Sequence, residues 1–272
     1  MPLNNKKIGI IGGGAMAEAI IAGVIKAGLA APEQFMVSDL SAGRREHLSN
    51  AYHIATSGDN LAPVAHGDLI ILAVKPYVMG DVLVQAGKRI SGQTVISIAA
   101  GITTGFIERL LPDKVPVIRV MPNTPLLVGA GATAVCCGRW ASDAHRQMAL
   151  TLFGSLGLAV PTPENLMDAV TGLSGSGPAY MYVIAEAMAD AGVRAGLPRE
   201  TAAALAAQTM LGAARMLLET GSHPAVLKDM VTTPGGTTIE GLNALEEGGL
   251  RAVVGKAVLS AARRSKQMSE EK

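Results

Sequence analysis

Ile8-Gly9-Ile10-Ile11-Gly12-Gly13-Gly14-Ala15-Met16-Ala17 is the stretch that decides the fold of this chain of 272 residues. Its apolar start predicts a buried strand, and its end predicts the first turn of a helix. Between them, Gly12-x-Gly14-x-x-Ala17 matches the dinucleotide fingerprint with alanine in its third position. Gly12 would make the tight turn, and Gly14 would let a pyrophosphate approach the backbone. The alternative interpretation is a tight strand-to-helix turn without a ligand.

Short apolar runs alternate with helical stretches through the first half of the chain. The runs are rich in Ile and Val on both faces, as buried parallel strands are. This alternation predicts an α/β fold with a Rossmann-type doubly wound sheet. The expected strands are Ile8–Ile11, Gln34–Ser38, Leu69–Ala73, Thr94–Ala99, Pro116–Val120 and Ala132–Cys137, and the expected helices are Ala15–Ala27, Gly43–Ala51, Thr104–Leu111 and Asp143–Leu156.

The carboxyl ends of these strands are the expected cofactor site, because a doubly wound sheet binds its ligand there. Asp39 ends the second strand at about the spacing of an acid that holds the ribose 2′-hydroxyl of NAD. Arg44 and Arg45 could instead wrap the 2′-phosphate of NADP with Ser38 and Ser41, so NAD(H) and NADP(H) both stay open. The candidate cofactor-binding residues are Ile11, Gly12, Gly13, Gly14, Ala15, Met16, Ser38, Asp39, Asn60, Ala73, Val74, Lys75, Pro76, Ala99 and Ala100.

The composition excludes several classes of function. A net charge of +1 without a basic run argues against nucleic-acid binding. We expect no membrane partner, because no apolar stretch reaches the roughly eighteen uninterrupted residues that a span requires. The N-terminus lacks the features of a signal peptide, and Cys136 and Cys137 are the only cysteines, so we expect a reducing cytoplasm. The five scattered histidines predict no metal site.

The character of the chain changes at Pro161 and Pro163, after which it is almost wholly helical. We therefore expect a dinucleotide-binding domain at 1–160 and an all-α dimerisation and substrate domain at 164–272. Two long helices, from Pro178 to Ala195 and from Pro198 to Thr220, are apolar around most of their circumference. Helices of that kind are buried, which favours a subunit interface over a compact monomeric bundle.

Pro234-Gly-Gly-Thr-Thr-Ile-Glu240 is the most informative stretch of the helical half. The proline ends one helix, the glycines free the backbone, and Thr237 or Thr238 is the expected N-cap of the next helix. A glycine turn that leads into a helix N-terminus can bind an anion such as a small carboxylate. The alternative is a turn and a cap with no ligand.

The chemistry is limited by a missing base. An alcohol dehydrogenase needs a His or Lys to remove the hydroxyl proton. No lysine lies between Lys114 and Lys228, and the histidines in that window are His145, expected on the outer surface of the nucleotide domain, and His223, directly before Pro224. Reduction of an imine is less demanding, because a hydroxyl or a water can supply the proton. The sequence therefore favours reduction of a C=N bond.

Four motifs together resemble the pyrroline-5-carboxylate reductase family along essentially the whole chain. They are Val74-Lys75-Pro76, Arg119-Val-Met-Pro-Asn-Thr-Pro125, Gly172-Leu-Ser-Gly-Ser-Gly-Pro-Ala-Tyr180 and Leu227-Lys-Asp-Met-Val-Thr-Thr-Pro-Gly-Gly-Thr-Thr-Ile-Glu240. The resemblance implies hydride transfer from NAD(P)H to 1-pyrroline-5-carboxylate, giving L-proline. It also implies homodimers, built through the helical domain, that assemble further into decamers.

The resemblance also implies the substrate-binding residues. It places the substrate carboxylate on the backbone of Gly236, Thr237 and Thr238, with the Thr238 hydroxyl as catalytic group at the ring nitrogen. Val231 and Thr233 would line the pocket. Ser176 would lie near the nicotinamide, although Ser174 to Pro178 could be only a helix start. Arg119 and Asn123 are expected to brace the loop between the domains and not to touch the substrate. Two departures from the family pattern, Ala15 and Met230, each replace a polar residue and remove a possible cofactor contact.

Two other functions remain open on the sequence. A β-hydroxyacid-type dehydrogenase would share the two-domain plan, but the missing helix lysine counts against it. A protein that binds a dinucleotide without turnover is the second alternative, and it would not need the turn from Pro234 to Glu240.

Overall fold

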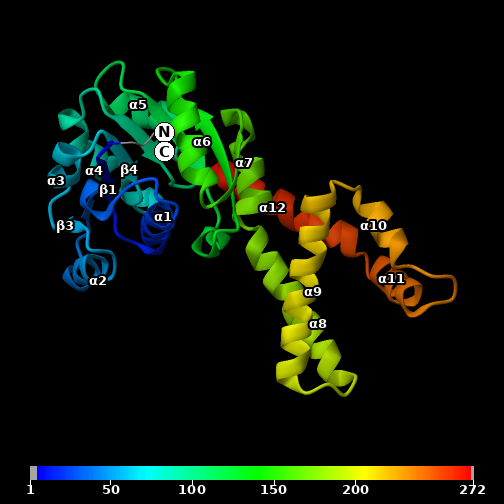
Figure 1. The fold of residues 1–272 in the computed structure, drawn as a ribbon. Helices are drawn as coiled ribbons and strands as arrows, with labels where there is room; N and C mark the ends of the chain where they lie inside the picture. The colour runs from blue at the N-terminus through cyan, green and yellow to red at the C-terminus, as the bar shows by residue number, and fades with distance from the viewer. Residues whose placement is uncertain (1–4, 271–272) are drawn as a thin grey trace. The chain divides into compact units, whose positions relative to one another are not determined.

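The computed structural model describes residues 5–270, and these form two compact units. The first unit contains the described residues up to Ser176 together with those from Leu259 onward, and the second unit is Gly177–Val258. Figure 1 shows the sheet of the first unit and the helices of the second.

The first unit is built on one sheet of eight strands, in the order β3-β2-β1-β4-β5-β6-β7-β8. Strands β1 to β6 are parallel to one another, β7 is antiparallel to β6, and β8 is parallel to β7. The predicted Rossmann-type sheet is thereby confirmed. The strands are β1 (Ile8–Ile11), β2 (Phe35–Ser38), β3 (Ala55–Ser57), β4 (Leu69–Leu72), β5 (Thr94–Ser97), β6 (Val117–Met121), β7 (Gly131–Cys137) and β8 (Gly157–Pro161).

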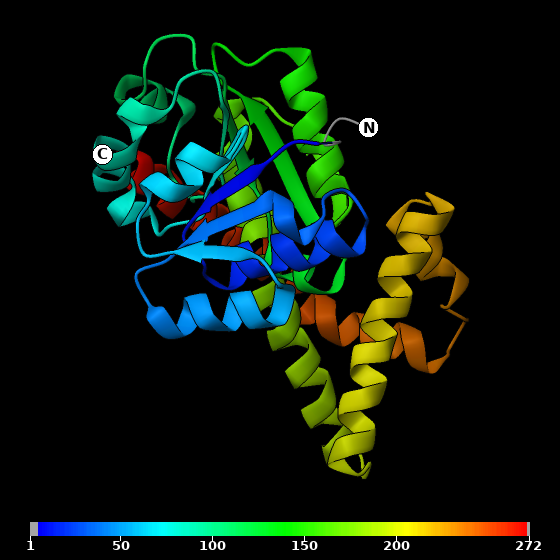
Figure 2. The same ribbon diagram turned by 60° about the vertical axis from the view of Figure 1, so that its left-hand side comes forward.

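Helices cover both faces of this sheet, as Figures 1 and 2 show. One hydrophobic core packs α1 (Ala15–Lys26), α2 (Ala42–Tyr52) and α6 (Asp143–Gly154) on the first face. A second core packs α3 (Leu61–His66), α4 (Met79–Ala86) and α5 (Thr104–Leu110) on the other face. Because both faces are buried, β1 and β4 are apolar at every position except Gly9, and all their residues are buried.

The structure contains elements that the sequence reading did not anticipate. Strands β3 and β8 and helices α3 and α4 were not among the expected elements. Helix α4 carries a regular apolar pattern, because Met79, Val82, Leu83 and Ala86 are its buried residues. Spacing of i, i+3, i+4 and i+7 is the signal of an amphipathic helix, so the pattern was present in the sequence.

The compact units differ from the expected domains at 1–160 and 164–272. Residues 164–176 pack within the first unit, where Met167 of α7 (Met167–Val170) is fully buried against Ala134 and Cys136. Ser265, near the end of α12 (Leu250–Glu270), donates a hydrogen bond to Asp168 over 2.6 Å. Residues 1–4 and 271–272 of the expected domains lie outside the described residues.

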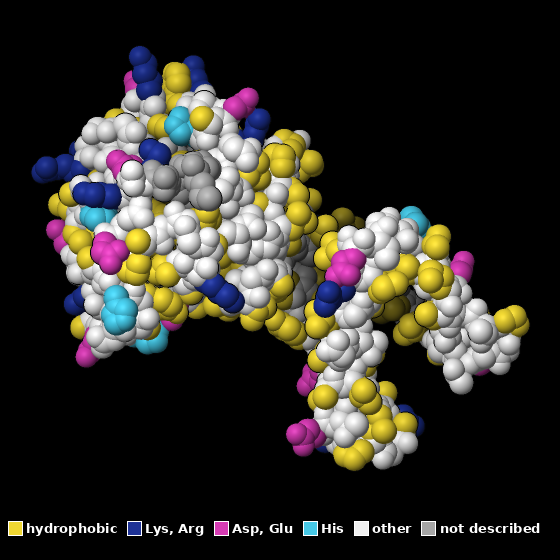
Figure 3. All heavy atoms as spheres, viewed as in Figure 1, with side chains coloured by type: hydrophobic (Ala, Val, Ile, Leu, Met, Phe, Trp, Pro, Cys, Tyr) yellow, Lys and Arg dark blue, Asp and Glu magenta, His cyan; other side chains and the backbone are white. Residues whose placement is uncertain are grey.

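The second unit contains α8 (Gly177–Arg194), α9 (Arg199–Thr220), α10 (Pro224–Met230), α11 (Thr237–Glu247) and the first part of α12. Helix α9 ends at Gly221 in a left-handed conformation, as expected. The buried apolar residues that α8 and α9 share are Ala189, Ala202 and Ala206. Larger apolar side chains, such as Leu205 and Leu218, are exposed in the single chain, and Figure 3 shows hydrophobic side chains along these helices.

Helix α9 also bears on the expectation that no segment could span a membrane. By length and composition alone, Arg199–Thr220 is long and apolar enough to cross a membrane, and 11% of its apolar window is buried within the chain. The polar side chains of Glu200, Arg215 and Glu219 lie near its two ends. A helix with this composition equally suits burial against another protein surface.

Candidate active site

Gly12 makes the turn at the end of β1. It has a φ of +99°, a conformation that favours glycine, and its N–H donates to the carbonyl of Ser38 over 2.8 Å. A Cβ atom at this position would lie 2.8 Å from the carbonyl oxygen of Ala73. The turn therefore packs against the carboxyl ends of β2 and β4, and only glycine fits at position 12.

Gly14 is the N-cap of α1, and its surroundings differ from those of Gly12. A Cβ atom on Gly14 would meet no other atom within 4 Å, and the residue is exposed. The first N–H groups of α1 thus face open space at the positive end of the helix dipole. This combination of a closed turn at Gly12 and an open helix start at Gly14 fits the pyrophosphate of a dinucleotide.

A cavity of about 510 Å³ lies at this end of the sheet. Eight candidate cofactor residues line it, namely Gly12, Gly14, Ser38, Asp39, Asn60, Ala73, Val74 and Lys75. Six residues that the sequence reading missed also line it, namely Leu40, Tyr77, Val78, Asp81, Val82 and Gln85. The last three lie on α4, so they were missed because that helix was not anticipated.

Polar residues at the end of β2 are held in a hydrogen-bond network. The Asp39 carboxylate accepts the N–H of Gly13 over 2.8 Å and the N–H of Ser41 over 2.8 Å. The Ser38 hydroxyl donates to the Asn60 side chain over 2.8 Å, and Asn60 in turn donates to Gln85 over 3.0 Å. These contacts fix the orientation of groups that would meet the adenine ribose.

The two arginines proposed for a 2′-phosphate already have partners within the chain. Arg44 donates to the carbonyl of Gly13 and pairs with the carboxylate of Glu18. Arg45 donates to the carbonyls of Asp39, over 2.8 Å, and Leu40, over 3.0 Å. Within the described part of the chain, Lys75 is the basic side chain that lines the cavity, alongside the acidic Asp39 and Asp81.

The remaining cofactor candidates surround this cavity or lie beyond β5. Ile11 is buried at the end of β1, and Gly13 is buried against Asp39 and Leu48. Ala15 and Met16 begin α1, and Pro76 begins the short 3₁₀ helix Pro76–Val78. Ala99 and Ala100 follow β5, where the N–H of Ala99 meets the Ser97 hydroxyl at 3.3 Å.

Ser176 is half-buried and closes a π-helical turn, Thr171–Gly175. Its N–H donates to the carbonyl of Thr171 over 2.8 Å. Turns of this type are frequently found at functional sites. The buried side chain of Asn123 contacts the turn, as its amide donates to the carbonyl of Ser174 over 3.0 Å.

Arg119 also connects neighbouring elements of the first unit. It is 2% exposed on β6 and pairs with the carboxylate of Glu164 at 3.4 Å. Glu164 accepts both the N–H and the hydroxyl of Thr104, over 2.7 and 2.5 Å, at the start of α5. No local pattern in the sequence indicates a role for Glu164, because its partners lie 45 and 60 residues away.

The candidate substrate turn lies between α10 and α11 in the second unit. Gly235 has a φ of +64°, whereas Gly236 has a φ of −84° and is the N-cap of α11. The expectation that Thr237 or Thr238 is the N-cap is therefore wrong, because both are already helical. The Gly236 N–H donates to the carbonyl of Thr233 over 3.0 Å, which closes the turn. The first N–H groups of α11 have no acceptor within their own helix.

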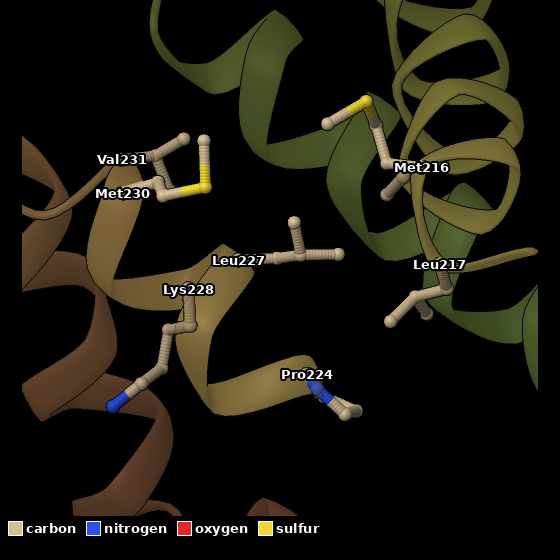
Figure 4. A pocket seen from close by; sticks show the side chains of 8 residues that line it. Met216, Leu217, Pro224, Leu227, Lys228, Met230 and Val231 are labelled. Carbon is tan, nitrogen blue, oxygen red and sulfur yellow. The ribbon is translucent and has the colours of Figure 1, made fainter. Parts of the chain in front are cut away.

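Val231 and Thr233 have different surroundings. Val231 lines an apolar cavity of about 340 Å³ between α9 and α10, together with Met216, Leu217 and Leu227. Figure 4 shows Leu227 projecting toward the side of α9 that carries Met216 and Leu217, whereas the Lys228 amine points away. Thr233 lies in the turn itself, where a Cβ on Gly236 would come within 2.3 Å of its hydroxyl oxygen.

Cys136 and His145 are titratable residues outside the candidate site whose pKa values are shifted. Burial, together with the nearby charge of Glu164, raises the pKa of the Cys136 thiol to about 12. His145 is half-buried and caps α6 with Ser142, and burial, with Lys6 nearby, lowers its pKa. No cluster of three His, Cys, Asp or Glu side chains within residues 5–270 could hold a metal ion.

Comparisons with known proteins agree along the whole chain. Residues 164–268 match the family model for pyrroline-5-carboxylate reductase dimerisation, and residues 7–101 match the model described as NADP oxidoreductase coenzyme F420-dependent. A pyrroline-5-carboxylate reductase of Methanosarcina acetivorans is 46% identical over 98% of this chain and 100% of its own length. Pyrroline-5-carboxylate reductase 1 of Bacillus subtilis is 40% identical over 98% of this chain and 91% of its own.

Solved structures give the same result. A pyrroline-5-carboxylate reductase from Coxiella burnetii matches with a TM-score of 0.91 and 36% identity, covering 98% of this chain and 99% of that one. The Plasmodium falciparum pyrroline carboxylate reductase, solved with NADP bound, matches with a TM-score of 0.89 and 32% identity over 98% of this chain and 99% of its own.

Proposed function

Because this chain belongs to the pyrroline-5-carboxylate reductase family, we propose that it reduces the C=N bond of 1-pyrroline-5-carboxylate to give L-proline. The bound NAD(P)H supplies the hydride. The observation that carries the proposal is the combination, within a chain matched over its full length, of the Gly12 turn and the glycine turn at Gly235 and Gly236. The family predicted from the four sequence motifs is confirmed.

The cofactor is assigned to the cavity at the carboxyl end of the sheet. Its pyrophosphate would lie at the open start of α1, next to Gly14. The adenine ribose would meet Asp39, Ser38 and Asn60, which are held in place by their hydrogen bonds. The small residues after β5, Ala99 and Ala100, would leave room for the nicotinamide ribose, and Lys75 would reach a ribose hydroxyl. The proposal covers both NAD(H) and NADP(H).

The substrate is assigned to the start of α11. The free N–H groups of its first turn, at Thr237 and Thr238, would receive the substrate carboxylate at the positive end of the helix dipole. The N–H of Gly236 is engaged by Thr233, so Gly236 would act by leaving space for the carboxylate. The Thr238 hydroxyl would donate to the imine nitrogen as the hydride arrives.

A hydroxyl is sufficient for this role. The imine nitrogen is basic enough to draw its proton from a hydroxyl or a water, whereas alcohol oxidation would require a stronger base. This agrees with the absence of lysine from the sequence between Lys114 and Lys228. Ser176 would lie on the nicotinamide side of the reaction, carried by the π-helical turn.

The protein is a homo-oligomer through its dimerisation segment. The second unit buries few residues of its own, and the apolar side chains of α8 and α9 need a partner surface. We extend this to a decamer built from dimers, in a cytoplasmic enzyme with no nucleic-acid or membrane partner.

One assay tests the function. The purified chain is mixed with NADH or NADPH and 1-pyrroline-5-carboxylate, and loss of the reduced nicotinamide absorbance is followed. Oxidation of the cofactor with formation of proline supports the proposal. Cofactor binding without turnover would favour a non-catalytic dinucleotide-binding protein, and turnover only with NAD⁺ or NADP⁺ and β-hydroxyacids would favour the related dehydrogenases.

A further inference from the structure

Asn123 lies two residues after β6 and is only 8% exposed. Both ends of its side-chain amide are engaged. The oxygen Oδ1 accepts the backbone N–H of Ala132, at the start of β7, over 2.8 Å. The nitrogen Nδ2 donates to the backbone carbonyl of Ser174, in the π-helical turn, over 3.0 Å.

The orientation of this amide is fixed by its partners. The N–H of Ala132 can only donate, so it must face the side-chain oxygen of Asn123. The NH₂ group then faces the carbonyl of Ser174, which can only accept. The two ends of the amide are not interchangeable. Asn123 therefore connects β7 to the turn with its oxygen on β7 and its NH₂ group on the turn.

The carbonyl of Ser174 lacks its usual α-helical donor for a reason that is visible in the sequence. In an α-helix, the carbonyl of residue i accepts the N–H of residue i+4. For Ser174 that residue is Pro178, which has no N–H. The Asn123 amide supplies a donor at the position where the proline cannot.

The same turn holds one extra residue. The N–H of Ser176 donates to Thr171, five residues back, where an α-helix would use four. The turn also packs closely on the sheet, since a Cβ on Gly175 would lie 2.6 Å from the methyl group of Met121. If the extra residue were absorbed into an α-helix, Ser176 would rotate by about 100° around the helix axis.

We propose that Asn123 is a positioning residue for the reaction, because its amide replaces the N–H that Pro178 lacks and so holds the π-helical turn that carries Ser176. This inference rests on the proposed function, which assigns Ser176 to the nicotinamide side. Asn123 itself touches neither substrate nor cofactor in this assignment. It acts through the carbonyl of Ser174.

The test compares four proteins: the unchanged chain, Asn123→Asp, Pro178→Ala and the double variant. Asp keeps an oxygen for the N–H of Ala132 but removes the donor to Ser174. Ala at position 178 restores a backbone N–H to the same carbonyl. For each protein, kcat, KM for the imine acid, Kd for the cofactor and Tm are measured. Asn50→Asp, on the exposed face of α2, makes the same chemical change elsewhere.

We expect Asn123→Asp to lower kcat by about 10–100-fold, the cost of a displaced group near the reaction centre, with the cofactor Kd unchanged. Pro178→Ala alone keeps kcat near that of the unchanged chain. In the Pro178→Ala background, the Asn123→Asp change lowers kcat and Tm by much less, because a second donor is present. Such non-additivity is the signature of two groups that serve one acceptor.

Two results would overturn the inference. One is an Asn123→Asp variant with unchanged kcat, and the other is equal losses of kcat in both backgrounds. If Asn123→Asp does not fold, Asn123→Thr removes the amide without adding a charge. Failure of both to fold in both backgrounds would also contradict a donor role that Pro178→Ala can replace. An unchanged chain without reductase activity would overturn the proposed function, while the Tm comparison would still test the hydrogen bond.

Discussion

The carboxylate of Asp39 accepts a hydrogen bond from the backbone N–H of Gly13 over 2.8 Å, which ties the end of β2 to the glycine turn after β1. Its other oxygen accepts the N–H of Ser41 over the same distance. The carboxylate is therefore held at the edge of the cavity where the adenine ribose would lie. A negative charge fixed at this position repels a 2′-phosphate and suits a ribose 2′-hydroxyl.

This arrangement predicts a preference for NADH that depends on Asp39. Asp39→Asn keeps an acceptor for Gly13 but removes the charge. We expect it to raise kcat/KM for NADPH relative to NADH by about tenfold, the effect of roughly 1.4 kcal/mol less repulsion. The measurement is the ratio of kcat/KM for the two cofactors. Asp68→Asn, at the amino end of β4, is the matched control, and an unchanged ratio in Asp39→Asn would contradict the prediction.

Thr238 is expected to carry the proton transfer. Positioned acid–base groups contribute about 10²–10⁴-fold, so Thr238→Ala should lower kcat/KM by at least the smaller factor. Cofactor affinity should not change. Thr238→Ser should retain most of the activity, because the hydroxyl remains. Thr237→Ala is the control, since the neighbouring threonine is assigned a backbone role; near-normal turnover in Thr238→Ala would remove its hydroxyl from the mechanism.

Gly236 is expected to matter because it leaves space at the start of α11. Its φ of −84° is open to any residue, so backbone strain at this position is not the obstacle. A Cβ would instead collide with the Thr233 hydroxyl and fill the space in front of α11. Gly236→Val should raise KM for the imine acid by about 10–100-fold, the value of one hydrogen bond to a charged group.

The neighbouring Gly235 provides the comparison. A side chain there meets open space, but its φ of +64° is strained for other residues. Gly235→Ala should therefore lower Tm more than it raises KM. If a folded Gly236→Val protein shows the KM of the unchanged chain, the substrate carboxylate binds elsewhere.

The sequence predicted most of the sheet, because buried parallel strands appear as short continuous apolar runs. β1 and β4 are short runs of Ile and Leu, interrupted only by Gly9, that follow Lys7 and Asp68, and both were expected nearly to the residue. Strand β3 was missed because Ala55–Ser57 is three residues long and has no apolar pattern. Strand β8 begins at Gly157 in a positive-φ conformation and alternates in exposure at the edge of the sheet.

The glycine turn of the candidate site could be predicted from the sequence, whereas the hydrogen bonds that support the site could not. Gly12 and Gly14 follow from the spacing of a motif, whereas the contact of Asn123 with Ser174 joins residues 51 positions apart. Nothing local in the sequence encodes such a contact. The N-cap of α11 was misplaced because threonine and glycine are about equally favoured as caps, and the turn closed by the Thr233 carbonyl places Gly236 there.

Glu18 on α1 should make stability depend on acidity. Burial raises the pKa of this carboxyl, but hydrogen bonds from His47, Arg44 and Tyr52 outweigh burial, so its pKa lies below the ordinary value of 4.5. A carboxyl with a lowered pKa stabilises the folded state above its unfolded pKa, and the contribution disappears as the pH falls through the folded pKa. Glu18→Gln should lower Tm at pH 7 and have a smaller effect near pH 3. The exposed Glu33→Gln variant is the control, and an equal Tm loss at both pH values would contradict this assignment.

The exposed apolar faces of α8 and α9 should determine assembly. Leu211 and Leu218 on α9 are 53% and 78% exposed in the single chain, and the core that α8 and α9 share is made of three alanines. Three buried alanines contribute too little apolar area to stabilise two long helices in water. We therefore expect a second subunit to cover them. Replacing both leucines by Glu should convert the oligomer to monomers with greatly reduced reductase activity, measured by light scattering during size-exclusion chromatography and by kinetic assay.

Gln208→Glu adds a charge to the same helix at a polar, exposed position and should leave the mass unchanged. A double Glu variant that keeps the mass of the unchanged protein would show that α9 faces solvent in the assembly.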